Sequence, residues 1–289
     1  MKLASFLQSG STDQPFCFVM GNPVEHSYSP EIHNFAARQY GLDWTYHKVE
    51  VLEDELEEAS RLFHLKHFTG ANITIPHKRS VIPYLDIIRK SAQEAGAVNT
   101  IVKKAGIISG YNTDEYGFSQ PLLQFADILK HGTAIVFGSG GACAAVVYAL
   151  MHHFHVNKIY VVTRNKSACN SQTELIQIIS YASVPDVIAT ADIIINSTPL
   201  GMGSFKDNSP LDPDLLAEVK SKICFDLIYN PLRTRFLKEC GANGAITING
   251  LPMFIHQAAK AFELWTGKEF PIDEAENLLI NKLKVTGED

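Results

Sequence analysis

Strand-like and helix-like patterns alternate along nearly the whole chain, and this alternation limits the fold more than any other feature. The apolar run Thr133–Phe137 is followed by a small-residue helical stretch at 141–154 and then by a second apolar run, Lys158–Val162. Because a parallel neighbour requires a crossover connection, usually a helix, this pattern predicts mainly parallel sheets with covered faces. Further strands are expected at residues 16–20, 44–49, 71–75, 97–102, 106–109, 193–195, 223–227 and 245–248, and helices at 30–40, 53–63, 114–129, 252–265 and 272–284.

The chain has 289 residues, which is long enough for two domains of ordinary size. Its formal net charge of -6 provides no basic field and argues against a nucleic-acid partner. There is no signal-peptide pattern at the N-terminus, and no stretch approaches the ~20 apolar residues that a membrane span needs. We therefore expect a cytosolic protein.

Metal and disulfide chemistry are not indicated. The five cysteines are odd in number and form no C-x-x-C motif, so reduced, buried thiols are expected. The histidine cluster His152, His153 and His155 has no accompanying carboxylate or cysteine. Solvated histidines at a helix end are the simpler interpretation, and no metal site is predicted.

The segment Asn72–Lys78 (NITIPHK) combines an apolar face with polar groups. In an extended segment Asn72 and Thr74 point to one side, while Ile73 and Ile75 point to the core. Pro76 ends strand pairing, and Lys78 follows just past the strand end, where open α/β sheets bind ligands. This pattern favours a small polar substrate, although an edge strand with a solvated face has the same pattern.

A glycine-rich turn, Gly138–Ala142 (GSGGA), directly follows an apolar strand and opens a helix, as a dinucleotide-binding fingerprint requires. Gly138 permits the tight turn, and Gly140 lets the backbone approach a pyrophosphate at the helix N-terminus. Cys143 stands at the third glycine position, where it is small enough for close helix packing.

The stretch after the second strand of this half reads Thr163-Arg164-Asn165, and no acidic residue occurs between Lys158 and Gln172. A carboxylate there would bind a ribose 2′-hydroxyl, whereas Arg164 can pair with a 2′-phosphate. The sequence therefore favours NADP, with a solvated arginine at a strand end as the alternative.

Other candidate residues are weak one by one. Ser27 and Ser29 present two hydroxyls at i and i+2 that suit a ligand carboxylate, but Ser29 before Pro30 is also an ordinary helix N-cap. Asp114 precedes a helical stretch and could be only its cap, and Asn99 could serve a turn.

With these residues in view, the chain resembles shikimate dehydrogenases along nearly its full length. Eight segments match in the order of that family, namely GNPVEHSYSPEIHN, GANITIPHK, GAVNT, GYNTDEYG, GSGGA, NSTPLGM, FDLIYNP and NGLPMFIHQA. The resemblance implies the reversible reduction of 3-dehydroshikimate to shikimate by NADPH, a step of aromatic amino-acid biosynthesis.

The resemblance also implies an α/β architecture of two domains with a deep cleft between them. Residues 1–114 with 251–289 would form the substrate domain, and residues 115–250 an inserted Rossmann-like NADP domain. The implied partners are the small-molecule substrate and the cofactor, without nucleic acid or membrane. The sequence allows a homodimer but does not determine it.

Residue roles follow from the motifs. The catalytic pair would be Lys78 and Asp114, with Lys78 as the proton donor to the reduced ketone and the base in oxidation left open between the two. The substrate site would comprise Ser27, Ser29, Asn72, Thr74, Asn99, Asp114, Tyr229 and Gln257. The cofactor site would comprise Gly138, Ser139, Gly140, Gly141, Ala142, Thr163, Arg164, Asn165, Lys166, Leu227, Gly250 and Met253.

The chain departs from the family pattern in three ways. Tyr28 replaces the leucine usual between the two serines, and the motif that is typically Asn-Arg-Thr reads Thr163-Arg164-Asn165. Ala168 stands where a second arginine is usual, with Lys166 able to compensate. Two alternatives stay open at this point: a quinate/shikimate dehydrogenase that uses NAD, and a non-catalytic NADP-binding regulatory paralogue. A flavin- or metal-dependent enzyme lacks supporting ligands.

Overall fold

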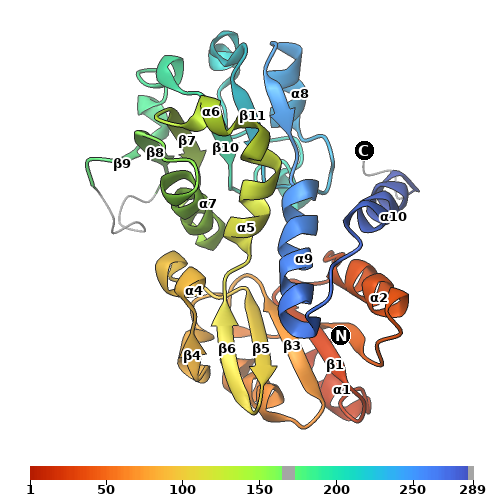
Figure 1. Ribbon diagram of the computed structural model, residues 1–289. Coiled ribbons are helices and arrows are strands. Elements are labelled where there is room, and N and C mark those ends of the chain that lie inside the picture. Colours follow the sequence, from red (N-terminus) through yellow and green to blue (C-terminus); the bar gives the residue numbers. More distant parts are fainter. Residues whose placement is uncertain (165–172, 286–289) are drawn as a thin grey trace. The chain divides into compact units, whose positions relative to one another are not determined.

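The computed structural model describes residues 1–164 and 173–285, which form two compact units (Figure 1). The first unit comprises Met1–Asp114 and Ile255–Leu279, and the second comprises Glu115–Phe254 and the chain from Ile280 onward. The first break between the units lies after Asp114. The return break lies inside helix α9 (Leu251–Thr266), between Phe254 and Ile255, because this helix contributes to both units.

The first unit is built on a mixed sheet in the order β2-β1-β3-β5-β6-β4. Strand β1 pairs in parallel with both of its neighbours, β2 and β3. On its other side β3 pairs antiparallel with β5, which forms an antiparallel hairpin with β6. The strands are β1 (Phe16–Gly21), β2 (Thr45–Glu50), β3 (Phe68–Ile73), β4 (Ile87–Ile88), β5 (Thr100–Lys104) and β6 (Ile107–Tyr111).

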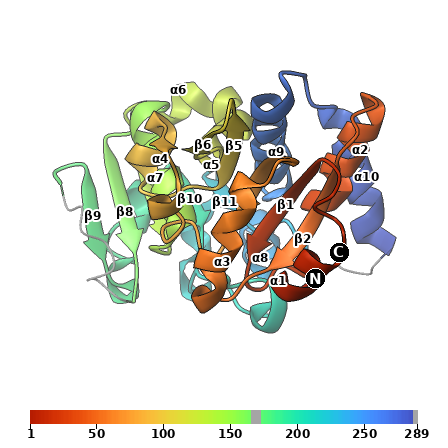
Figure 2. The same cartoon turned by 90° about the horizontal axis from the view of Figure 1, so that it is seen from below.

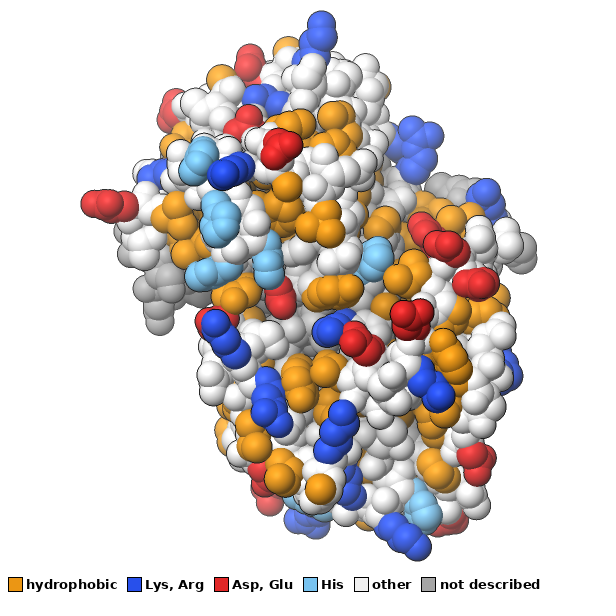
Figure 3. Space-filling model, in the orientation of Figure 1, with side chains coloured by type: hydrophobic (Ala, Val, Ile, Leu, Met, Phe, Trp, Pro, Cys, Tyr) orange, Lys and Arg blue, Asp and Glu red, His pale blue; other side chains and the backbone are white. Residues whose placement is uncertain are grey.

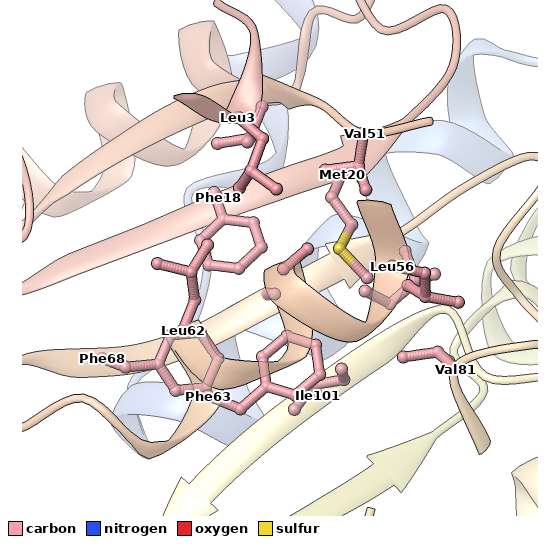
Figure 4. Close-up of a cluster of buried hydrophobic side chains, with 14 of the residues drawn as sticks. Leu3, Phe18, Met20, Val51, Leu56, Leu62, Phe63, Phe68, Val81 and Ile101 are labelled. Carbon is pink, nitrogen blue, oxygen red and sulfur yellow. The ribbon is translucent and has the colours of Figure 1, made fainter. Parts of the chain in front are cut away.

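Alternating side chains of β1 separate two apolar layers in this unit. Phe16, Phe18 and Met20 pack with α1 (Leu3–Gln8), α3 (Leu56–Ser60) and the turn after it. Figure 4 shows Phe18 and Met20 in this cluster with Leu3, Leu56 and Leu62. Cys17 and Val19 face the opposite way, toward Trp265 of α9. In Figure 2, α1 and α3 lie on one side of β1, and α2 (Ser29–Gln39) and α9 lie on the other.

The second unit contains an all-parallel sheet in the order β12-β11-β10-β7-β8-β9. The order reverses between β7 and β10, which is where such sheets bind ligands beyond the carboxyl ends of the strands. The strands are β7 (Thr133–Phe137), β8 (Lys158–Val162), β9 (Ile176–Ile179), β10 (Ile193–Asn196), β11 (Ile223–Asp226) and β12 (Ile246–Ile248).

Apolar side chains cover both faces of this second sheet. One layer includes Phe118, Val146 and Leu150 against Val136, and the other includes Phe236 and Leu237 against Phe137. The expected α/β fold with mainly parallel sheets is therefore confirmed. The remaining α-helices of the described ranges are α4 (Lys90–Ala95), α5 (Asp114–Ser119), α6 (Ala126–Leu129), α7 (Gly141–His152), α8 (Arg235–Ala242) and α10 (Ile272–Val285).

Three expectations about local structure were wrong. The helix expected at 53–63 is α3 flanked by two 3-10 turns, and the helix expected at 114–129 is α5 and α6 separated by the 3-10 segment Gln120–Phe125. The strand expected at 71–75 ends at Ile73, so Ile75 is 72% exposed and not part of the core. The short elements α1, α4, α8, β4 and β9 were not anticipated.

Candidate active site

The loop after β3 presents Lys78. The chain turns at once, because His77 N donates to Thr74 O at 2.9 Å, and Lys78 O accepts from Val98 N at 2.7 Å. The buried His77 ring bonds the carbonyl of Val51 at 2.7 Å. These contacts fix the backbone on both sides of the lysine, so the ammonium group is presented from an anchored loop.

Lys78 forms an ion pair with Asp114, the first residue of α5, and the two side chains are only 16% and 9% exposed. The second carboxylate oxygen of Asp114 accepts from Asn99 Nδ2 at 2.7 Å. Asp114 N donates to Asn112 Oδ1 at 3.0 Å. The carboxylate of Asp114 is thus bound by a lysine and an amide, and its interpretation as only a helix cap was wrong.

A chain of hydrogen bonds continues from Asp114 through β5 to β3. Asn99 Oδ1 accepts from Thr100 Oγ1 at 2.9 Å and from Thr113 N at 2.7 Å. Thr100 Oγ1 in turn accepts from Asn72 Nδ2 at 3.1 Å. Asn72, Asn99, Thr100 and Thr113 are all buried. Apolar strands therefore hold a connected polar network beside the lysine, with the partners that buried polar groups require.

The same network reaches the two serines through Tyr46. Asn72 Oδ1 accepts from the Tyr46 hydroxyl at 2.6 Å, and Ser29 hydrogen-bonds the Tyr46 oxygen. Ser27 Oγ donates to Ser29 Oγ at 3.1 Å. Ser29 lies inside α2, whose N-cap position is Tyr28, so the N-cap interpretation of Ser29 was wrong.

Tyr46 is the site residue that the sequence did not reveal. It is 2% exposed, and burial raises its pKa well above the usual value, with the Cys17 thiol adding to the shift and the Ser29 hydroxyl opposing it. The phenol therefore stays protonated and acts as a hydrogen-bond donor. Its only signal in the sequence is an aromatic residue in β2, which is typical of strands in general.

Three other predicted substrate residues are Thr74, Gln257 and Tyr229. Thr74 follows the end of β3. Its methyl group packs against Gly21, where an added Cβ would lie 2.3 Å from the Thr74 methyl carbon. Gln257 is a half-buried residue of α9 in the first unit. Tyr229 belongs to the second unit, where its ring stacks on Phe254 at a centroid distance of 4.3 Å. Their roles stay predictions.

In the second unit the glycine-rich turn connects β7 to α7 at the reversal of strand order. Gly138 has φ +109°, and a Cβ there would lie 2.6 Å from Ser197 Oγ, so only glycine fits. A Cβ at Gly140 would meet nothing within 4 Å, and α7 has no side-chain cap at its N-terminus. This open helix end, free of a competing anionic side chain, fits the pyrophosphate of a dinucleotide.

The end of β8 lies next to this turn. Ser139 Oγ and Thr163 Oγ1 are hydrogen-bonded at 3.1 Å. Burial raises the pKa of Tyr181, and the positive charge of Arg164 opposes that rise. The exposed Arg164 therefore lies near the Tyr181 hydroxyl. A cavity of about 210 Å³ beside Tyr181 is lined by Phe137, Leu211 and further residues. The predicted cofactor residues Asn165 and Lys166 lie outside the described residues.

The loop after β11 lies against the start of α9. A Cβ at Gly250 would lie 2.1 Å from Leu227 O, and Gly250 N donates to Ile228 O at 2.9 Å. Because this N–H is already used, Gly250 could contact a cofactor only through its carbonyl group. Met253 is 7% exposed and packs in the core of the second unit, so packing alone accounts for it.

Asp226 connects three loops at the carboxyl end of the second sheet. The fully buried carboxylate accepts from Asn196 Nδ2 at 3.0 Å, Ile228 N at 3.0 Å and Thr234 Oγ1 at 2.7 Å. Burial raises its pKa from 3.8 to about 6, and these three donors oppose the rise. Asp226 thus positions the Leu227 loop and the loop after β10 without facing solvent.

Lysine and arginine side chains mingle with acidic ones over the described part of the face in Figure 3, without a continuous basic band. Within residues 1–164 and 173–285, no group of three or more His, Cys, Asp or Glu side chains is arranged to hold a metal ion.

Two protein-family models match separate segments of the chain. Residues 19–101 match the model of the shikimate dehydrogenase substrate binding domain, and residues 250–280 match the shikimate 5'-dehydrogenase C-terminal domain. The NADP(+) shikimate dehydrogenase of Methanococcus maripaludis is 39% identical over 259 residues, which are 87% of this chain and 91% of that protein. The chain belongs to the shikimate dehydrogenase family.

Solved structures agree with this assignment. The shikimate 5-dehydrogenase of Thermus thermophilus, crystallised with NADP(H) and shikimate, has a TM-score of 0.81 and 32% identity, covering 93% of this chain and 99% of that one. The quinate dehydrogenase of Corynebacterium glutamicum, crystallised with NAD, also has a TM-score of 0.81, with 29% identity and the same coverage. The fold is therefore shared by enzymes with different substrates and cofactors.

Proposed function

We propose that this chain is an NADP-dependent shikimate dehydrogenase that reversibly reduces 3-dehydroshikimate to shikimate in aromatic amino-acid biosynthesis. The observation that carries the proposal is the Lys78–Asp114 ion pair, which forms one end of a buried polar network on the first unit. A ketone reduction needs one hydride and one proton, and NADPH supplies the hydride when it is bound. The chain itself must supply the proton.

Lys78 is the proton donor in this proposal. As negative charge develops on the substrate oxygen, an ammonium N–H gives its proton to that oxygen, and the product is an alcohol. Asp114 binds Lys78 from the other side and holds the ammonium group in one position. By microscopic reversibility, the neutral amine accepts the proton when shikimate is oxidised. Asp114, which accepts a hydrogen bond from Asn99 Nδ2, orients the lysine.

Substrate binding is proposed for the rest of the network. The Ser27 and Ser29 hydroxyls suit the carboxylate of shikimate, and Asn72, Asn99 and Asp114 suit its ring hydroxyls because amide and carboxylate oxygens accept hydrogen bonds. Thr74, Gln257 and Tyr229 complete the proposed site. The assignment of residues 1–114 and 251–289 to substrate and of 115–250 to the dinucleotide is supported by the match of residues 19–101 to a substrate binding domain.

The cofactor is proposed to be held by the turn Gly138–Ala142, by Thr163 and by Arg164. Backbone N–H groups at the start of α7 suit the pyrophosphate, and the guanidinium group suits a 2′-phosphate. Leu227, Gly250 and Met253 are proposed as further contacts from the loop after β11 and from α9, with Asn165 and Lys166 beside Arg164.

A cytosolic location is also proposed. No helix in the described parts of the chain is long and apolar enough to span a membrane. The support for the location comes from Cys17, Cys143, Cys224 and Cys240, which are buried free thiols. Reduced cysteines of this kind are typical of cytosolic proteins.

The direct test is a spectrophotometric assay of NADPH formation by the purified chain, with shikimate or quinate and with NADP or NAD. We expect the highest kcat/KM for the pair of shikimate and NADP. A preference for quinate with NAD would instead assign the chain to the group of the quinate dehydrogenase neighbour. Cofactor binding without any turnover would identify a non-catalytic paralogue and contradict the proposal.

A further inference from the structure

Tyr46 occupies the middle of the polar network and is not among the residues assigned to substrate or catalysis. Its hydroxyl donates to Asn72 Oδ1 at 2.6 Å on one side and is hydrogen-bonded by Ser29 on the other. It therefore joins the two serines, proposed to bind the substrate carboxylate, to the amide proposed to bind a ring hydroxyl. No other residue in the described contacts makes this connection.

The Tyr46 side chain is held firmly in place from two directions. Asn34 Nδ2 donates to Tyr46 O at 3.0 Å, and Tyr46 N donates to Asn34 Oδ1 at 2.8 Å, so one side chain fixes the backbone of the tyrosine. The ring of His33 stacks on the tyrosine ring with a centroid distance of 4.6 Å and an interplanar angle of 13°. The adjacent residues His33 and Asn34 thus leave the hydroxyl group little freedom.

The hydrogen bonds of Asn72 show what this hydroxyl does. Both hydrogens of Asn72 Nδ2 are used, one by Asn99 O at 3.2 Å and one by Thr100 Oγ1 at 3.1 Å. Asn72 Oδ1 accepts a hydrogen bond from the Tyr46 hydroxyl and has one further lone pair. In this orientation Asn72 can face a ligand only as an acceptor. The ligand group it selects is therefore a donor, which suits the hydroxyl of a polyol ring.

We propose that Tyr46 is a positioning residue for substrate binding, because its hydroxyl fixes the orientation of the Asn72 amide and of the Ser29 hydroxyl. Tyr46 thereby sets the affinity for a carboxylate whose ring carries hydroxyl groups. This inference rests on the proposed function for the identity of the ligand. Tyr46 is separated from Lys78 by Asn72, Thr100, Asn99 and Asp114, so it does not take part in proton transfer.

The test compares Tyr46→Phe with the unaltered full-length chain by calorimetric titration with shikimate and by steady-state kinetics. We expect Kd and KM for shikimate to rise about tenfold, the loss typical of one hydrogen bond. The values of kcat and of KM for NADP should stay unchanged, because the Lys78–Asp114 pair and the second unit are untouched. Unchanged Kd and KM for shikimate would overturn the proposal.

Two further variants distinguish positioning from general loosening of the fold. Thr100→Val removes the next hydroxyl of the chain beyond Asn72, preserves the side-chain shape, and should raise Kd for shikimate in the same way. His33→Phe keeps the ring stacked on Tyr46 and leaves every hydrogen bond of the network in place, so Kd should not change. An equal rise of Kd in His33→Phe would show that packing, and not the hydroxyl, is responsible.

The calorimetric measurement also separates this inference from the proposed function. A chain that binds shikimate but does not turn it over refutes the proposed activity, and the Kd of Tyr46→Phe still decides the role of the tyrosine. A chain that neither binds nor oxidises shikimate refutes both.

Discussion

His33 makes the first unit sensitive to acid, and the size of the effect can be derived from its surroundings. The side chain is fully buried among the rings of Tyr46, Trp265 and Phe270, and neither ring nitrogen has a hydrogen-bond partner. Burial lowers the pKa of His33 from 6.5 to about 3. The imidazole is therefore neutral in the folded chain at pH values well above 3.

The sign of the effect follows from this lowered pKa. Below pH 6.5 the unfolded chain binds a proton at this position and the folded chain does not, so acid favours unfolding. At about pH 5 the loss amounts to ~2 kcal/mol of the free energy of unfolding. Between about pH 6.5 and pH 3 it grows to at most ~5 kcal/mol, and above pH 6.5 the effect vanishes.

The assay is urea unfolding of the chain and of His33→Phe at neutral pH and at about pH 5. The two tryptophans, Trp44 and Trp265, both belong to this aromatic cluster, so their fluorescence reports unfolding of the first unit. We expect the unaltered chain to lose ~2 kcal/mol more than the variant over this range. The half-buried His47 contributes equally to both proteins and cancels. Identical pH dependence in the two proteins would refute the reasoning.

Three other predictions concern the second unit. Arg164→Ala should raise KM for NADP by tens of fold and spare NAD, as expected for the loss of a charge-assisted pair. The control Lys158→Ala, at the start of β8, should change neither KM, and equal changes for both cofactors in Arg164→Ala would exclude a 2′-phosphate contact. Gly140→Ala should leave the melting temperature unchanged, because a Cβ at this position meets nothing within 4 Å, but it should raise KM for NADP. An unchanged KM for NADP would show that the pyrophosphate binds elsewhere. Asp226 has a raised pKa, so its contribution to the free energy of unfolding is present below pH 3.8 and is lost as the pH rises through about 6. Asp226→Asn should remove this pH-dependent component, up to ~3 kcal/mol, as measured by circular-dichroism unfolding curves. The same pH dependence in Asp226→Asn and in the unaltered chain would contradict the raised pKa.

The sequence predicted the centre of the second unit best. The bounds of β7 and β8 match the expected residues because central parallel strands are buried on both faces and read as uninterrupted apolar runs. The strand expected to end at Ile75 was less predictable. Its end depends on the turn that begins at Thr74, which leaves no periodic signal in the sequence.

For the candidate site, the sequence indicated the residue types but not their connections. The motifs singled out Ser29, Asn72 and Asp114, whereas Tyr46 was missed. It lies 26 positions before Asn72 in the sequence, and its strand β2 is separated from β3 by β1 in the folded sheet. A sequence pattern also cannot show that Ser29 bonds Tyr46 and does not cap α2, since a serine before proline suits both.

The central claim is that Lys78 supplies the proton and that Asp114 holds the Lys78 ammonium group in position. The measurement that tests it most directly is the steady-state kinetics of Lys78→Ala with shikimate and NADP, with Arg79→Ala as a control for the loss of an exposed cation in the same loop. The account predicts that kcat of Lys78→Ala falls by roughly 10²–10⁴-fold, the range of general acid–base catalysis, while KM for shikimate changes far less. A variant that retains its kcat and shows only a raised KM would reduce Lys78 to a binding residue and contradict the account.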